Sequence, residues 1–147
     1  MGGEAASSAL ARPIRLGRLE VYLLSDGTFR LDGGAMYGVV PKALWERGAP
    51  ADERNRVLLS IGCLLVRTPG GKNILVDAGL SSKYDSNKKF IHTYSVERKR
   101  TLLDELSALS LSPGDIHLVV NTHLHFDHAG GDTERDDAGR LRPQFPN

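Results

Sequence analysis

The sequence predicts an α/β domain in which helices cover a mixed β-sheet. Three observations lead to this class. Apolar stretches of strand length alternate with segments of helical spacing, the strands are rich in Val, Ile and Leu, and polar residues gather directly after the last apolar stretch. Open α/β sheets keep their ligands at the C-terminal ends of strands, so we expect the chemistry there.

The N-terminal part of the chain predicts β structure. Residues 14–31, IRLGRLEVYLLSDGTFRL, alternate apolar side chains and contain an Asp26-Gly27 pair, which predicts two strands joined by a turn. The Gly-rich stretch 32–40 predicts an irregular loop. Residues 41–47 predict a short helix with a proline near its first turn. We expect residues 1–13 to be a disordered tail and residues 14–147 to form the domain.

The middle of the chain continues the alternation. Strands are expected over about 57–67 and 73–77, and their apolar composition is typical of strands buried on both faces. A helix is expected over about 96–109, and a last apolar strand over 115–120. The apolar stripe of this helix consists of Leu102, Leu103, Leu106 and Leu109.

Composition excludes several classes of protein. With 147 residues, 40% hydrophobic, 25% charged and a net charge of +1, the chain resembles an ordinary globular domain and offers no electrostatic reason to bind nucleic acid or an acidic membrane. The basic run 88–100 is typical of a solvated helix face. No apolar stretch approaches the ~20 residues that span a bilayer. Cys63 is alone, which excludes an internal disulfide, and we expect it to be a buried, inert thiol. A cytoplasmic location is the default expectation.

The stretch NTHLHFDHAGG, residues 121–131, carries the chemistry. His123 and His125 lie two apart, so in an extended backbone they project to one side and can bind one ion. Asp127 and His128 follow a bend and can bind a second. Imidazole and carboxylate suit zinc and neighbouring divalent ions, and two ions ~3.5–4 Å apart can share the hydroxide that performs hydrolysis. We expect Leu124 and Phe126 to point into the core, and the glycine pair to let the backbone turn tightly.

This stretch resembles the H-x-H-x-D-H motif of the metallo-β-lactamase-fold hydrolases. ILVDAG (74–79) is similar to an earlier strand of that family, and the segments at 26–45 and 133–147 resemble the branch of quorum-quenching N-acyl-homoserine lactonases and organophosphate hydrolases. The resemblance implies an αββα sandwich, of which this chain supplies the N-terminal half.

The same resemblance implies roles for individual residues. His123 and His125 would bind the first metal and Asp127 and His128 the second. The ions would be two divalent metals, with Zn²⁺ expected and Mn²⁺, Co²⁺ or Fe²⁺ possible. Asp127 would also act in catalysis by orienting the attacking hydroxide. Asp77 would orient the loop that carries the metal ligands without binding the metal itself, with a turn-capping carboxylate as the alternative. His92 and His117 match no motif, so we expect them to be surface residues.

The family's second half supplies a further histidine, a bridging aspartate and a last histidine, which have no counterpart here. We therefore expect an apolar face of the sheet to need cover, either from a C-terminal half or from a second copy in a homodimer. The favoured function is a metal-dependent hydrolase that opens a lactone or similar ester bond of a small-molecule substrate. The alternative is a truncated, non-catalytic binding or interaction module that retains a partial metal site. Met36 and Tyr37 are candidates to line an acyl pocket, with ordinary packing as the other interpretation.

Overall fold

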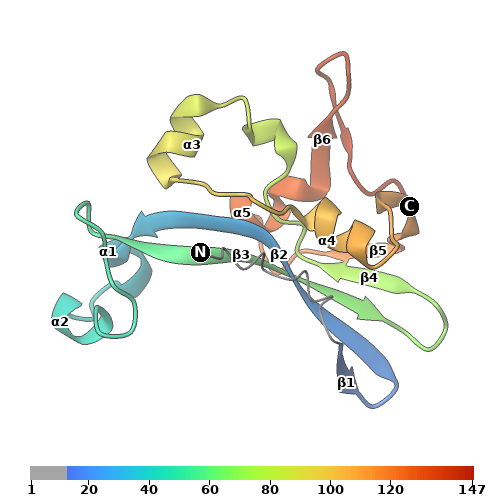
Figure 1. The fold of residues 1–147 in the computed structure, drawn as a ribbon, viewed down its shortest axis with the longest axis horizontal. Helices are drawn as coiled ribbons and strands as arrows, with labels where there is room; N and C mark the ends of the chain where they lie inside the picture. The colour runs from blue at the N-terminus through green and yellow to red at the C-terminus, as the bar shows by residue number, and fades with distance from the viewer. Residues whose placement is uncertain (1–12) are drawn as a thin grey trace, which may run out of the picture.

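The computed structural model describes residues 13–147, so nearly all of the predicted tail lies outside the described residues. A five-stranded mixed sheet forms the frame, with strand order β1-β2-β3-β4-β5 (Figure 1). All neighbouring strands are antiparallel except β4 and β5, which are parallel. The strands are β1 (Ile14–Leu16), β2 (Leu19–Asp32), β3 (Arg56–Arg67), β4 (Asn73–Val76) and β5 (Leu118–Val120). A separate hairpin follows, made of β6 (Thr133–Arg135) and β7 (Leu141–Pro143). The predicted α/β class is confirmed.

The helices are short. They are α1 (Gly33–Tyr37), α2 (Lys42–Trp45), α3 (Lys88–Tyr94), α4 (Leu102–Ala108) and α5 (Phe126–Ala129), with 3-10 turns at Ser82–Tyr84, Pro113–Asp115 and Gly130–Asp132. No helix among residues 13–147 has the length and apolar character needed to cross a membrane.

One helix prediction and one loop prediction were wrong in extent. The helix expected over 96–109 begins only at Leu102, because Thr101 and Asp104 form a capping box that fixes the start there. The stretch 32–40 is not wholly irregular, since the Asp32 side chain accepts a hydrogen bond from Ala35 N and starts α1.

For the strand pair predicted in residues 14–31, the position of the turn at Asp26-Gly27 was wrong. The first turn is at Gly17, and β2 then runs without a break past the Asp-Gly pair. A β-bulge lies between Ser25 and Thr28, and Gly27 has a left-handed φ of 107°. Asp-Gly suits a bulge as well as a hairpin turn, so the sequence alone did not distinguish them. The bulge turns Asp26 into the protein interior.

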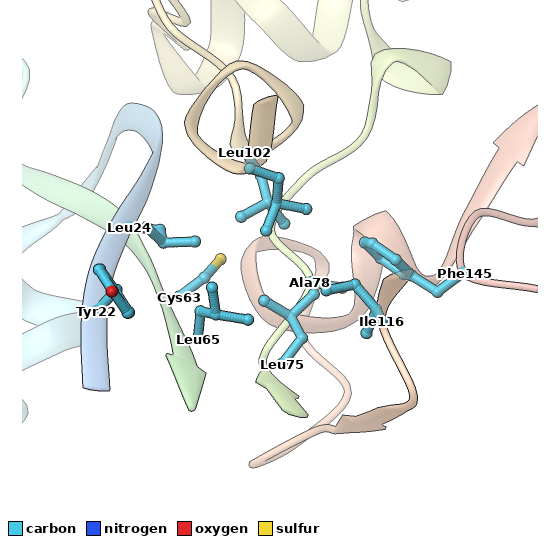
Figure 2. Packing of buried hydrophobic residues seen from close by; sticks show 10 residues of the cluster. Tyr22, Leu24, Cys63, Leu65, Leu75, Ala78, Leu102, Ile116 and Phe145 are labelled. Carbon is cyan, nitrogen blue, oxygen red and sulfur yellow. The ribbon is translucent and has the colours of Figure 1, made fainter. Parts of the chain in front are cut away.

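One face of the sheet packs against α4 to form the core. Leu24, Cys63 and Leu65 from the sheet face Leu102 and its helix (Figure 2). Leu106 is fully buried beside them. Leu103 was predicted to belong to the apolar stripe, but it is 36% exposed, so the prediction was wrong for this residue. Phe145, after β7, closes the far end of the same cluster.

The opposite face of the sheet is apolar and exposed. Cross-strand partners on this face form a row, Leu23–Leu64–Val76–Val120, beside a second row, Ile14–Val21–Val66–Ile74–Leu118. Leu23 is 66% exposed and Leu118 is 50% exposed. The expectation that β3 and β4 are buried on both faces was therefore wrong for this chain. The strands have the composition of two-sided burial, but in the described residues only one side is covered.

Candidate metal centre

The residues predicted to bind metal lie directly after β5, in a segment we call the metal loop (residues 121–131). His123 and His125 are exposed, while Asp127 and His128 lie on the single turn of α5 and are partly buried. The His123 ring centroid is 4.7 Å from that of His125 and 4.0 Å from that of His128. His128 Nε2 is 3.1 Å from the Asp127 carboxylate. The three imidazoles and the carboxylate thus occupy one small region.

Asp77, at the end of β4, orients His128. Its carboxylate oxygen Oδ2 lies 2.8 Å from His128 Nδ1, which leaves Nε2 on the other side of the ring. The same carboxylate accepts hydrogen bonds from Thr122 N at 2.8 Å and Thr122 Oγ1 at 2.9 and 3.0 Å. Burial opposes the charge of Asp77, but the hydrogen bonds from His128 and Thr122 outweigh burial and lower its pKa. The ionised Asp77 carboxylate therefore fixes Thr122 and His128 by hydrogen bonds. Carboxylates in metal sites commonly orient a metal-binding histidine in this way.

Thr122 belongs to this network, and the sequence analysis did not single it out. Its hydroxyl lies 3.1 Å from His123 Nδ1 and 3.5 Å from His128 Nδ1 while it also contacts Asp77, so it lies between two of the three histidines. A hydroxyl directly before the first histidine was the only available sign of this role.

Phe126 anchors the loop in a second cluster of apolar side chains. Its ring lies 5.3 Å from Phe29 and 5.2 Å from Phe90, both edge to face, and 5.0 Å from Tyr94. Such aromatic pairs add stability beyond simple burial. Phe126 therefore points inward as predicted. Leu124, expected to do the same, is 82% exposed, because the backbone turns into α5 only after it.

Gly130 and Gly131 let two backbone segments touch. Ala78 N donates to His128 O at 2.7 Å, and Gly131 N donates to Gly79 O at 2.8 Å. A Cβ on Gly131 would overlap the Ala78 carbonyl oxygen, so no larger residue fits. The glycines are thus required by close packing against residues 78–80, rather than by a tight turn around ions.

The donors of this loop fit a divalent transition metal. Three imidazoles and a carboxylate, without a thiolate, are ligands that zinc accepts, and His128 already has one nitrogen held by a carboxylate. Within residues 13–147, however, no three His, Cys, Asp or Glu side chains are arranged around a common point. Cys63 is buried in the core under α4, among apolar side chains. The loop therefore offers a donor set of the right kind that is not closed into a complete site.

The other candidate residues lie apart from this loop. Tyr37 stacks on Trp45 at 4.8 Å between centroids, which favours its packing role, and Met36 is exposed on α1. Figure 1 shows α1 and α2 in an arm at the end of the sheet, away from α5. His92 and His117 are exposed, as expected, and His117 Nδ1 accepts a hydrogen bond from Asn73 N. The structure gives Met36 and Tyr37 no contact with the metal loop.

The profile of a known family matches residues 57–138, which include Asp77 and the whole metal loop; its description is the metallo-beta-lactamase superfamily. The chain belongs to this superfamily. The predicted resemblance is thereby confirmed.

Solved structures of the superfamily share this fold. A probable metal-dependent hydrolase from Staphylococcus aureus is 36% identical, with a TM-score of 0.76 over 83% of this chain and 43% of that protein. AidC, a dizinc quorum-quenching lactonase, is 28% identical, with a TM-score of 0.62 over 94% of this chain and 43% of AidC.

Curated relatives are similar over a shorter region. The N-acyl homoserine lactonase of Bacillus thuringiensis is 31% identical over 81 residues, which is 50% of this chain and 32% of that enzyme. The chain thus spans less than half the length of each of these relatives, and its similarity to lactonases is distant and partial.

Proposed function

We propose that the protein is a metal-dependent hydrolase that opens a lactone or a similar ester bond, with N-acyl-homoserine lactones as the substrates to test first. The observation that supports this most is the metal loop, where four donors gather and Asp77 fixes the orientation of one of them. The lactonases among the relatives suggest the bond to be broken.

Each side chain of the loop has a task in this proposal. His123 and His125 would hold one divalent ion, and Asp127 and His128 would hold another, with zinc favoured by the nitrogen and oxygen donors. When bound, such ions polarise a carbonyl group and activate water at neutral pH.

Asp127 would act as the catalytic carboxylate, because it lies beside His128 Nε2 and can orient a water molecule by accepting its proton in a hydrogen bond. Asp77 would keep His128 in the tautomer whose Nε2 carries a free lone pair.

We further propose that the apolar face of the sheet is covered in the working protein. The face presents Leu23, Leu64, Leu118 and Val120 to solvent as neighbours, and contiguous exposed apolar residues of this kind are typical of an interaction surface. A second sheet from the remainder of the domain is the favoured cover, since superfamily structures extend well beyond the part matched here. A second copy of this chain is the alternative.

The test combines metal analysis with a substrate panel on the full-length protein. Lactones, simple esters and phosphotriesters would be offered after the metal content has been measured. Turnover of lactones with two bound ions per protein supports the proposal. Stoichiometric metal with no turnover of any substrate would favour the alternative of a binding module, and a metal-free, inactive protein would contradict both.

A further inference from the structure

A buried carboxylate outside the metal loop contacts the segment that supports the loop. Asp26, at the bulge of β2, is 1% exposed. Its Oδ2 accepts a hydrogen bond from Leu80 N at 2.7 Å, and its Oδ1 accepts from Leu102 N at 2.7 Å and from Arg98 Nη2 at 2.9 Å. A buried charge is tolerated only when it is paired and hydrogen-bonded in this way.

The contact with Leu80 is reinforced by the residue before it. Gly79 has a φ of 70°, and a Cβ there would lie 2.6 Å from Asp26 Oδ2 and 2.8 Å from its Cβ. The absence of a side chain at Gly79 therefore lets the carboxylate lie directly against the backbone.

The opposite edge of the same short segment faces the metal loop. Gly79 pairs with Ala129 in an isolated parallel bridge, and Ala78 N and Gly79 O bond to His128 O and Gly131 N. The chain of contacts runs from Asp26 through residues 78–80 to the backbone of residues 128–131, which carries His128.

We propose that Asp26 is a positioning residue of the metal centre: it fixes residues 78–80, and these fix the backbone from which His128 points. The inference rests on the proposed metal-binding function. Asn at this position would keep the shape but offer one acceptor oxygen in place of two, so the N–H of either Leu80 or Leu102 would face an amide NH₂ group. The guanidinium of Arg98 would also lose the buried negative charge with which it forms an ion pair.

The experiment compares Asp26→Asn with Val57→Ala in the full-length protein. Val57 is equally buried but belongs to neither side-chain cluster described above, so its truncation lowers stability without touching residues 78–80. Zinc affinity is measured on the folded fraction by competition with a chelator, and amide hydrogen exchange is followed at Leu80 and Gly131.

Asp26→Asn is expected to weaken zinc binding about tenfold or more, the size of effect seen for supporting residues of metal sites, and to accelerate exchange at both amides. Val57→Ala should lower the melting temperature while zinc affinity stays within about twofold, since surrounding structure is unchanged. Zinc affinity within twofold of wild type in Asp26→Asn would overturn the proposal, as would equal losses in both variants at equal loss of stability.

Two further measurements keep the test decisive. If Asp26→Asn does not fold, Gly79→Ala disrupts the same contact from the other side and should give the same loss of zinc affinity. In the wild-type protein, Leu80 and Gly131 amides should exchange together, and free exchange at Leu80 beside a protected Gly131 would overturn the proposal without any variant. A wild-type protein that binds zinc but opens no lactone would contradict the proposed substrate and leave this inference intact.

Discussion

His125 is a proposed metal ligand that we expect to contribute little to folding. It is exposed, and its ring touches only that of His123 among the rings of the described residues. Asp77, by contrast, is 6% exposed and holds both ends of the metal loop. Of the two residues, we expect His125 to serve in metal binding, whereas Asp77 holds the backbone and side chains of the loop in place.

The first prediction follows for His125→Ala. Metal content and hydrolysis should both fall to background, while the free energy of unfolding of the metal-free protein should change by less than about 0.5 kcal/mol, as for other surface substitutions. Metal analysis and denaturant unfolding measure the two effects. His92→Ala, an exposed histidine on α3, is the control and should change neither. Retained metal in His125→Ala would contradict the ligand assignment.

A second prediction concerns Cys63. Burial, and then the charges of Asp26 and Asp77, raise the pKa of this thiol to about 12. The thiolate is the reactive form, so at pH 8 the native protein should not react with a thiol reagent over hours. The same reaction in denaturant, where the thiol is exposed, should go to completion. Rapid labelling of the native protein would show that the core around α4 opens readily.

At the scale of elements, the strands were predictable because apolar runs mark them. β3 and β4 were placed within one residue of their observed limits, and the metal loop was found after β5. The bulge at Asp26 was not predictable, because its cause is a set of partners 54 to 76 residues away. The start of α4 was readable from Thr101 and Asp104, but the helix was predicted to begin about six residues earlier, at about residue 96. Features that depend on neighbouring residues were readable from the sequence, whereas the bulge, which depends on distant partners, was not.

The contact between residues 78–80 and the metal loop gives a third prediction. Gly131→Ala places a methyl group where the Ala78 carbonyl oxygen lies, so the two segments must separate. We expect a loss of about 1–3 kcal/mol in stability, typical of overpacking, together with a loss of metal. Gly62→Ala is the matched control, since a Cβ there meets no atom within 4 Å. Chemical denaturation and metal titration of both variants would check this. Equal behaviour of the two variants would show that the close contact is not required.

On the scale of the whole molecule, the exposed face of the sheet leads to a fourth prediction. Leu64→Glu places a charge in the middle of this face. In a polypeptide limited to residues 1–147, it should reduce self-association and dye binding, because the charge stays in water. In a protein in which the proposed cover is present, it should destabilise the fold, because an unpaired charge would be buried under that cover. Calorimetry and light scattering distinguish these cases, with Ser107→Glu on the exposed side of α4 as the control. Identical effects in both proteins would show that nothing covers this face.

The contacts around residues 77–80 also bear on the order of events during folding. Asp77 meets Thr122 and His128 across 45 and 51 residues, and Asp26 reaches Leu80 across 54. Each such contact closes a long loop of chain, and contacts of large sequence separation form slowly. Three remote stretches must therefore meet before the histidines have a fixed backbone. The metal centre is expected to be among the last parts of the chain to form, so an ion would be captured by a folded scaffold rather than nucleating one.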